Sequence, residues 1–355
     1  MAYTTIDDPS AYFHTQLYSG TGSAQSITND ANAGDFKPDW VWVKKRTGGT
    51  ARNHTLTDSS RGATKGLFSS LNDAEATNAQ GLTSFNSDGF SVGTYNNFNE
   101  SDGTYVGWQW IANGGTTSSN TDGSITSTVQ ANTTAGFSIV TWTGNGSNST
   151  IGHGLGAVPK MVICKNRDSA GTSWQIYHAE AQSSGADQLK FTTDAVASNT
   201  AVWNNTAPSS SVFTVGTGDG VNKSGDNLIA YCFAEKKGYS KFGSYTGNGN
   251  DNGAFVYTGF KPKFAIFKAV SVAGEGWAIR DSARSPFNQM SNKLSANTSA
   301  AEGTVVDDND CDFVSNGIKL RSNDNQMNYS GATFIYYAVA EHPLVSSEGV
   351  PTIAR

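Results

Sequence analysis

The densest group of side chains capable of chemistry is a run of acidic residues at positions 307 to 312. Asp308, Asp310 and Asp312 alternate as the first ligands of a calcium-binding loop do, because carboxylate oxygens suit Ca²⁺. An EF-hand loop would continue with a glycine and end on a glutamate, but Phe313 and Lys319 occupy those positions. Two interpretations stay open, a calcium site and a solvated acidic turn, and the failed continuation favours the turn.

His153 is the second candidate for catalysis or metal binding. Glycines flank it in the loop Ile151-Gly152-His153-Gly154-Leu155-Gly156, and they would leave the imidazole free to react. No second histidine or cysteine stands at the spacing that a zinc site requires. We therefore expect His153 to be a turn residue.

Two aspartate–arginine pairs share one spacing. Arg61 follows Asp58 by three residues, and Arg284 follows Asp281 in the same way. A carboxylate and a guanidinium can fix a loop or bind a charged substrate. In the second copy of this segment, Ala181 stands at the position of the arginine. Because the pair does not recur there, we expect structural pairing and not a substrate site.

Motifs of nucleophilic, phosphate-binding and zinc-protease chemistry do not occur. The sequence has no Gly-x-Ser-x-Gly, no Gly-x-x-x-x-Gly-Lys-Ser/Thr and no His-Glu-x-x-His. We expect a protein that is not an enzyme, with no catalytic, cofactor-binding or metal-binding residues and no cofactor. Paired carboxylates of a glycoside hydrolase are the alternative, because they need only spatial adjacency.

The three cysteines are predicted to be buried free thiols. Their number is odd, and Cys164 and Cys232 lie inside apolar runs typical of strands. The amino terminus has neither a basic region nor an apolar stretch, so we expect no secretion signal. Synthesis in a reducing cytoplasm fits both observations.

Charge and hydropathy exclude two classes of partner. The formal net charge is −6 and only 15% of residues are charged, so no basic face for nucleic acid is expected. No apolar run reaches the length of a membrane span. Frequent Gly, Ser, Thr and Asn fit short strands joined by tight turns.

A sequence pattern that occurs three times indicates how the elements are organised. Each copy opens with an aromatic residue and a Gly-x-Gly turn, and has a proline followed six residues later by lysine. Each copy closes on a glycine followed nine residues later by alanine. The conserved spacings are Pro38 to Lys44, Pro159 to Lys165 and Pro262 to Lys268, then Gly103 to Ala112, Gly225 to Ala234 and Gly331 to Ala340. Such self-similarity predicts a repeat architecture.

The predicted fold is all-β, with three tandem repeats of about a hundred residues, each an antiparallel β-sandwich. An alternative packs the repeats around a shared axis with pseudo-threefold symmetry. One short helix per repeat is expected, for example from Thr64 to Ala79. The predicted units are residues 1–115, a Ser/Thr/Gly-rich linker at 116–136, repeats at 137–238 and 239–345, and a tail at 346–355.

Two Trp-x-Trp pairs permit either a binding surface or a core. Trp40 and Trp42, like Trp108 and Trp110, lie two residues apart and so on one face of a strand. Exposed, they would stack on sugar rings. Apolar residues replace them in the other copies, which favours a core position.

Four segments carry a resemblance to a known family. They are Met1-Ala2-Tyr3-Thr4-Thr5-Ile6-Asp7-Asp8-Pro9-Ser10, Lys37-Pro38-Asp39-Trp40-Val41-Trp42-Val43-Lys44, the His153 loop, and Ala230-Tyr231-Cys232-Phe233-Ala234-Glu235-Lys236-Lys237-Gly238-Tyr239-Ser240-Lys241-Phe242. The chain resembles repetitive virion proteins of marine tailed bacteriophages. The resemblance implies a structural protein on the virion surface, a tail fibre, receptor-binding knob or capsid decoration, and it implies no catalytic residues.

The expected function is therefore that of a virion appendage in host adsorption or receptor binding. Alternatives are a capsid decoration protein, and a carbohydrate-binding or polysaccharide-degrading tail spike. Expected partners are other virion proteins, further copies of the chain in a homo-oligomer, with a trimer favoured, and a glycan or protein of the host surface.

Overall fold

Antiparallel strands dominate the structure, a computed structural model that describes residues 3–30, 36–181, 187–304 and 311–352. Tight turns join the strands, and no described helix exceeds four residues. Many turn glycines adopt a positive φ, which a side chain would disfavour. The all-β prediction is confirmed.

Three six-stranded sheets form the framework. The first has the order β1 (Phe13–Ser19), β9 (Thr104–Trp110), β3 (Trp40–Thr47), β4 (Thr55–Asp58), β5 (Lys65–Phe68) and β6 (Ala76–Thr77). The second has the order β10 (Ser118–Asn120), β11 (Ser127–Asn132), β12 (Phe137–Thr143), β19 (Asn227–Ala234), β14 (Pro159–Asn166) and β15 (Gln175–His178). The third has the order β20 (Ser240–Thr246), β28 (Thr333–Pro343), β22 (Phe260–Ala269), β23 (Ala278–Asp281), β24 (Asn292–Ser295) and β25 (Gly303–Thr304).

Smaller sheets and short helices complete the three lobes. The small sheets are β2 (Gln25–Ile27), β8 (Phe90–Val92) and β7 (Leu82–Phe85); β13 (Ser149–Gly152) and β18 (Val212–Val215); β16 (Asp187–Gln188) and β17 (Ala197–Ser198); and β21 (Phe255–Tyr257), β27 (Gly317–Leu320) and β26 (Cys311–Val314). The helices are α1 (Asn96–Asn99), α2 (Thr200–Trp203), α3 (Asp219–Asn222), α4 (Asn325–Asn328) and the 3₁₀ turns Pro9–Ala11 and Ala179–Ala181.

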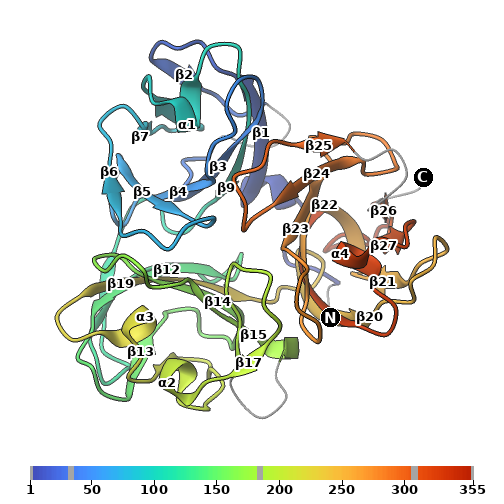
Figure 1. The fold of residues 1–355 in the computed structure, drawn as a ribbon. Coiled ribbons are helices and arrows are strands. Elements are labelled where there is room, and N and C mark those ends of the chain that lie inside the picture. The colour runs from blue at the N-terminus through green and yellow to red at the C-terminus, as the bar shows by residue number, and fades with distance from the viewer. Residues whose placement is uncertain (1–2, 31–35, 182–186, 305–310, 353–355) are drawn as a thin grey trace.

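The molecule has three lobes around a common centre (Figure 1). The first lobe comprises β1 to β9, the second β10 to β19 and the third β20 to β28. One hydrophobic cluster contains Trp40 of the first lobe, Tyr231 of the second and Phe264 of the third, and all three side chains are buried. Side chains of all three lobes therefore meet in one core.

The central strands of each large sheet are buried on both faces. The inner face of the sheet belongs to the shared cluster, while its outer face packs in a second cluster with the small sheet of its own lobe. For example, Trp42 faces the centre, whereas Val41 and Val43 contact Phe90 of β8 in the outer cluster. Burial on both faces explains the continuous apolar runs of β3, β14 and β22.

Two expectations about individual segments differ from the structure. The helix predicted from Thr64 to Ala79 is wrong, because β5 and β6 occupy this segment. Pairing of β5 with β4 places Leu67 in the shared core, and this tertiary contact outweighs the weak local preference of a segment that contains Gly66. The segment 116–136, expected to be a linker or surface loop, contains both β10 and β11, which pair with each other, and β11 also pairs with β12.

Candidate functional site

The lysines that recur in the sequence pattern are completely buried. Lys44, Lys165 and Lys268 end apolar runs, and each ammonium group donates a hydrogen bond to a main-chain carbonyl. Burial lowers the pKa of each amine to about 8. The closest acceptors are the carbonyl oxygens of Arg52, Thr172 and Glu275, at 2.6 Å in each case.

Two of these lysines also join the lobes. Lys44 of the first lobe donates to the carbonyl of Ser299 in the third lobe at 3.0 Å. Lys165 of the second lobe lies 3.4 Å from the carbonyl oxygen of Asn72 in the first lobe. These two amines are thus engaged in the interfaces, and burial denies a substrate access to all three.

Asp58 and Arg61 form the ion pair that their spacing predicts, and both side chains are sealed from solvent. The hydroxyl of Tyr231, from the second lobe, donates to the carboxylate of Asp58 at 2.8 Å. Arg61 also contacts Glu75 at 2.9 Å, and Glu75 binds Arg167 of the second lobe at 2.9 Å. This network fixes the first lobe to the second.

Asp281 and Arg284 repeat this arrangement between the third lobe and the first. The indole N–H of Trp108, from the first lobe, donates to the Asp281 carboxylate at 3.0 Å. Arg284 binds Glu302 at 2.9 Å, and Glu302 binds Arg46 of the first lobe at 2.7 Å. The prediction of structural pairing is confirmed for both aspartate–arginine pairs.

The second lobe uses a histidine at the corresponding position. The imidazole Nε2 of His178 lies 3.2 Å from the carbonyl oxygen of Tyr336 in the third lobe. Burial lowers the pKa of His178 to about 4, so the ring is neutral at physiological pH. The indole N–H of Trp277 makes a second link, donating to the carbonyl of Lys190 at 2.7 Å.

His153 lies in a buried turn. Its Nε2 lies 3.2 Å from the carbonyl oxygen of Ser209, and its Nδ1 accepts from the main-chain N–H of Leu155 at 3.2 Å. Burial lowers the pKa of the imidazole. Both ring nitrogens therefore hold the loop in place, which agrees with the expected turn role.

The cysteine prediction is confirmed, since Cys164, Cys232 and Cys311 are free and buried. The acidic run is covered only in part, because Asp308 and Asp310 lie outside the described residues. Asp312 binds Arg321 at 2.6 Å. Within residues 3–30, 36–181, 187–304 and 311–352, no group of three or more His, Cys, Asp or Glu side chains is placed to hold a metal ion.

The four tryptophans of the Trp-x-Trp pairs are core residues. Trp40, Trp42, Trp108 and Trp110 belong to the shared cluster and are almost completely buried. Trp40 stacks on Tyr231 of the second lobe with ring centroids 4.3 Å apart. The core interpretation of these pairs is confirmed, and they offer no surface for a sugar.

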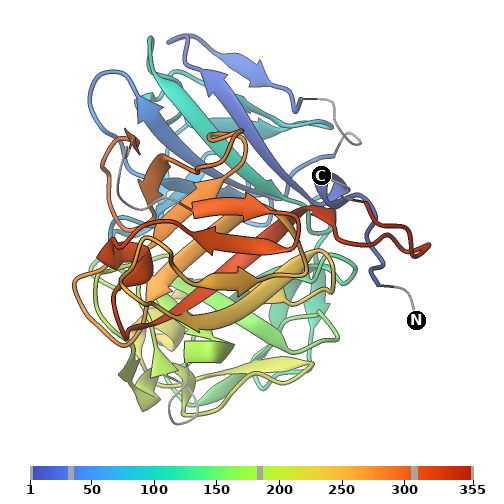
Figure 2. The same cartoon turned by 90° about the vertical axis from the view of Figure 1, so that its right-hand side faces the viewer.

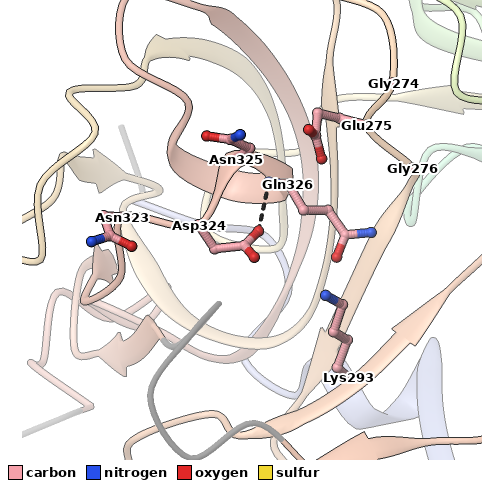
Figure 3. Close-up of a pocket in the computed structure, with 8 residues that line it drawn as sticks. All are labelled: Gly274, Glu275, Gly276, Lys293, Asn323, Asp324, Asn325 and Gln326. Carbon is pink, nitrogen blue, oxygen red and sulfur yellow. Dashed lines mark hydrogen bonds between the residues drawn. The ribbon is translucent and has the colours of Figure 1, made fainter.

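An open polar depression of about 550 Å³ on the third lobe is a site where side chains remain available for chemistry (Figure 3). The loop before β23 supplies Glu275, β24 supplies Lys293, and the start of α4 supplies Asp324 and Gln326. The remaining lining residues are Gly274, Gly276, Asn323 and Asn325.

Two carboxyl groups dominate the electrostatics of this depression. Burial and the neighbouring Asp324 carboxylate raise the pKa of Glu275, while Lys268 and Lys293 oppose the rise. Asp324 accepts the main-chain N–H of Gln326 at 2.6 Å and so caps α4. Such a pair can exchange a proton or accept hydrogen bonds from hydroxyl groups.

Sequence reasoning did not find this depression. Glu275 and Asp324 stand in different strand connections, and no motif spacing relates them. Only the packing of α4 beside the loop before β23 brings them together (Figure 3).

None of the described helices is long and apolar enough to cross a membrane.

Comparisons with known proteins identify a family. No curated protein matches the sequence. A family model described as a domain of unknown function (DUF7483) matches residues 8–343, which include all three lobes. The chain therefore belongs to this family of domains of unknown function, DUF7483.

Proposed function

We propose that the protein is a non-enzymatic structural component of a tailed bacteriophage virion, displayed on the particle surface in host adsorption. One observation carries the proposal: the recurring residues that could do chemistry are buried in contacts between the lobes. Lys44, Asp58 and Asp281 each bind a group of another lobe. The resemblance of the sequence to virion appendage proteins supports the same role.

The architecture suits a protein that acts outside the cell. Three lobes share one core, and hydrogen bonds or ion pairs join each lobe to both neighbours. Such a unit resists local opening, because exposing one interface also breaks the shared core. Assembly as a homo-oligomer, a trimer by preference, would multiply weak contacts with a receptor.

Localisation on purified virions tests this proposal. Antibody labelling and mass spectrometry of density-purified particles should find the protein in the virion, and cryo-electron microscopy should place a three-lobed density on its surface. A position near the tail supports adsorption, while copies spread over the shell support the decoration alternative. Absence of the protein from purified virions would overturn the proposal.

A polysaccharide-degrading tail spike is the second candidate, favoured by one observation. Glu275 and Asp324 line the same open depression, and glycoside hydrolases use paired carboxyl groups, one of them with a raised pKa. New reducing ends released from host envelope polysaccharide, and lost in Glu275→Gln, would establish this activity. No release by the wild-type protein would eliminate it.

A further inference from the structure

The small sheet β21–β27–β26 presents an aromatic surface on the third lobe. Val256 of β21 is buried in the outer core of this lobe, together with Ile318 of β27. Its neighbours Phe255 and Tyr257 point to the opposite side, since side chains alternate along a strand. They are 48% and 55% exposed. We call this outward side of the sheet the aromatic face; Figure 2 shows the third lobe towards the viewer.

Charged and small residues complete the aromatic face. Strand pairing places Lys319 and Asp312 in one row with Phe255, and Gly317 in the next row with Tyr257. A Cβ atom at Gly317 would come within 2.8 Å of the Phe255 ring. Glycine at this position therefore leaves room for the ring to lie along the sheet.

A second glycine supports Tyr257. The hydroxyl of Tyr3 donates to the carbonyl of Gly259 at 2.6 Å, and the Tyr257 hydroxyl lies over the same glycine. Lys237 lies over the Tyr3 ring, 4.7 Å from its centroid. The amino-terminal segment thus extends the aromatic face by a third ring.

The corresponding faces of the other lobes carry hydroxyl groups instead. Ile27 pairs with Phe90 in the first lobe and Ile151 with Phe213 in the second, as Val256 pairs with Ile318 in the third. The residues that directly precede Ile27, Ile151 and Val256 are Ser26, Thr150 and Phe255. Fold formation therefore does not require an aromatic residue at this position.

The dimensions of the aromatic face select a small partner. Residues two apart on a strand are separated by roughly 6.6 Å, so that one ligand can contact both rings. Two half-exposed rings offer on the order of 200 Å², whereas a stable protein interface buries about 800 Å² on each side. Lys319, Asp312 and the adjacent Arg321 interrupt any larger apolar area with charge.

We propose that the aromatic face binds a pyranose oligosaccharide, whose apolar ring surfaces stack on Phe255 and Tyr257 while its hydroxyl groups bind Lys319 and the Tyr257 hydroxyl. Aromatic rings with a few polar groups are the usual lining of such sites. This inference rests on the proposed adsorption role and names the class of its receptor. It also locates the contact on one lobe of the three.

Binding of defined oligosaccharides to the intact protein tests the inference. The probes are immobilised hexamers of β-1,4-glucose, β-1,3-glucose, β-1,4-N-acetylglucosamine and alginate. At least one should bind with a Kd of millimolar or tighter. Tyr257→Ala and Phe255→Ser, the latter copying the first lobe, should each weaken binding about tenfold or more. Val158→Ala, which trims a side chain that is 46% exposed on the second lobe, should leave it unchanged.

Two results would overturn the inference: no probe binding at millimolar concentration, or full binding by both face variants. Matching thermal unfolding curves must show that the variants are folded, and Phe255→Ser supplies a fold-compatible change. Failure of the proposed function is a separate result. Virions that contain the protein while no hexamer binds refute only the oligosaccharide site, whereas binding by a protein absent from virions supports the site and refutes the virion role.

Discussion

The hydroxyl of Tyr231 donates a hydrogen bond to the carboxylate of Asp58 across the boundary between the second and first lobes, at 2.8 Å. Both side chains are buried. Trp108 and Asp281 repeat this relationship between the first lobe and the third. A buried carboxylate is costly unless its hydrogen bonds are made. The arginine of its own lobe supplies part of the hydrogen bonds of each aspartate, and the neighbouring lobe supplies a further donor, so that the lobes stabilise one another.

Tyr231→Phe is expected to destabilise the whole protein. The substitution keeps the ring in the core but removes the donor to Asp58, and loss of a hydrogen bond to a charged group costs about 1.5–3 kcal/mol. Chemical denaturation should show the loss in one cooperative transition. Tyr257→Phe, at an exposed ring, is the matched control. An unchanged free energy of unfolding in Tyr231→Phe would contradict the interlobe role.

The buried network around Arg284 predicts a larger effect. Arg284→Met leaves the carboxylate of Asp281 without its cation and Glu302 with Arg46 alone, and breaking a buried ion pair in this way costs about 3–5 kcal/mol. Arg321→Met, in the half-exposed pair with Asp312, should cost less than about 1 kcal/mol. Equal losses in the two variants would show that the Arg284 network does not stabilise the fold.

The sequence predicts the local elements of this fold well, because local patterning decides them. Continuous apolar runs indicated β3, β14 and β22, and the Trp-x-Trp spacing indicated one face of a strand. The aspartate–arginine spacing indicated the pairs of Asp58 and Asp281. The shared core could not be derived in the same way, since strands buried on both faces also suit separate sandwiches.

A bulge explains one limit of the sequence comparison. Lys45 pairs with Tyr105 and Thr47 with Thr104, so Arg46 is an extra residue in β3. Counting back from the closing alanines aligns Trp108 with Ala230. In the structure, Trp108 pairs with Trp42, and Tyr231 pairs with Ile163 at the matching position of the second lobe, so Trp108 corresponds to Tyr231. The bulge also turns Arg46 towards Glu302.

The depression and the aromatic face were beyond sequence reasoning for a different reason. Glu275 and Asp324 meet only through packing, and the exposure of Phe255 depends on which side of β21 faces the core. Aromatic residues in a strand predict burial more often than exposure. The strand register buries Val256, and it is this register that leaves Phe255 exposed.

The buried thiols give a prediction about reactivity. Burial raises the pKa of Cys164 well above its ordinary value, and the thiolate is the reactive form. A thiol reagent such as DTNB should therefore label none of the three cysteines in the native protein and all three in denaturant. Fast labelling of one native cysteine would show an opening of the core near that residue, and single Cys→Ala variants would identify it.

The buried lysines predict a rise of stability with pH. Lys44, Lys165 and Lys268 have a pKa of about 8 in the folded protein, lowered by burial from 10.5. Between these values the unfolded chain binds more protons than the folded chain, so the free energy of unfolding increases with pH. Buried thiols such as Cys164, whose pKa is raised above 9.0, oppose the trend above that pH, and buried tyrosines such as Tyr231, whose pKa is raised above 10.0, add to this opposition above pH 10.0. Denaturation experiments from about pH 8 to pH 9 should show the increase.

Lys165→Met tests the source of this slope. The variant removes one of the three titrating amines and keeps an apolar chain in the same space, so it should lose about one third of the slope while the other two lysines supply the rest. Lys237→Met, at an exposed lysine, should keep the full slope. If Lys165→Met retained the wild-type slope, the amine would stay charged across this range, and its bond to the Thr172 carbonyl would outweigh the desolvation that lowers its pKa.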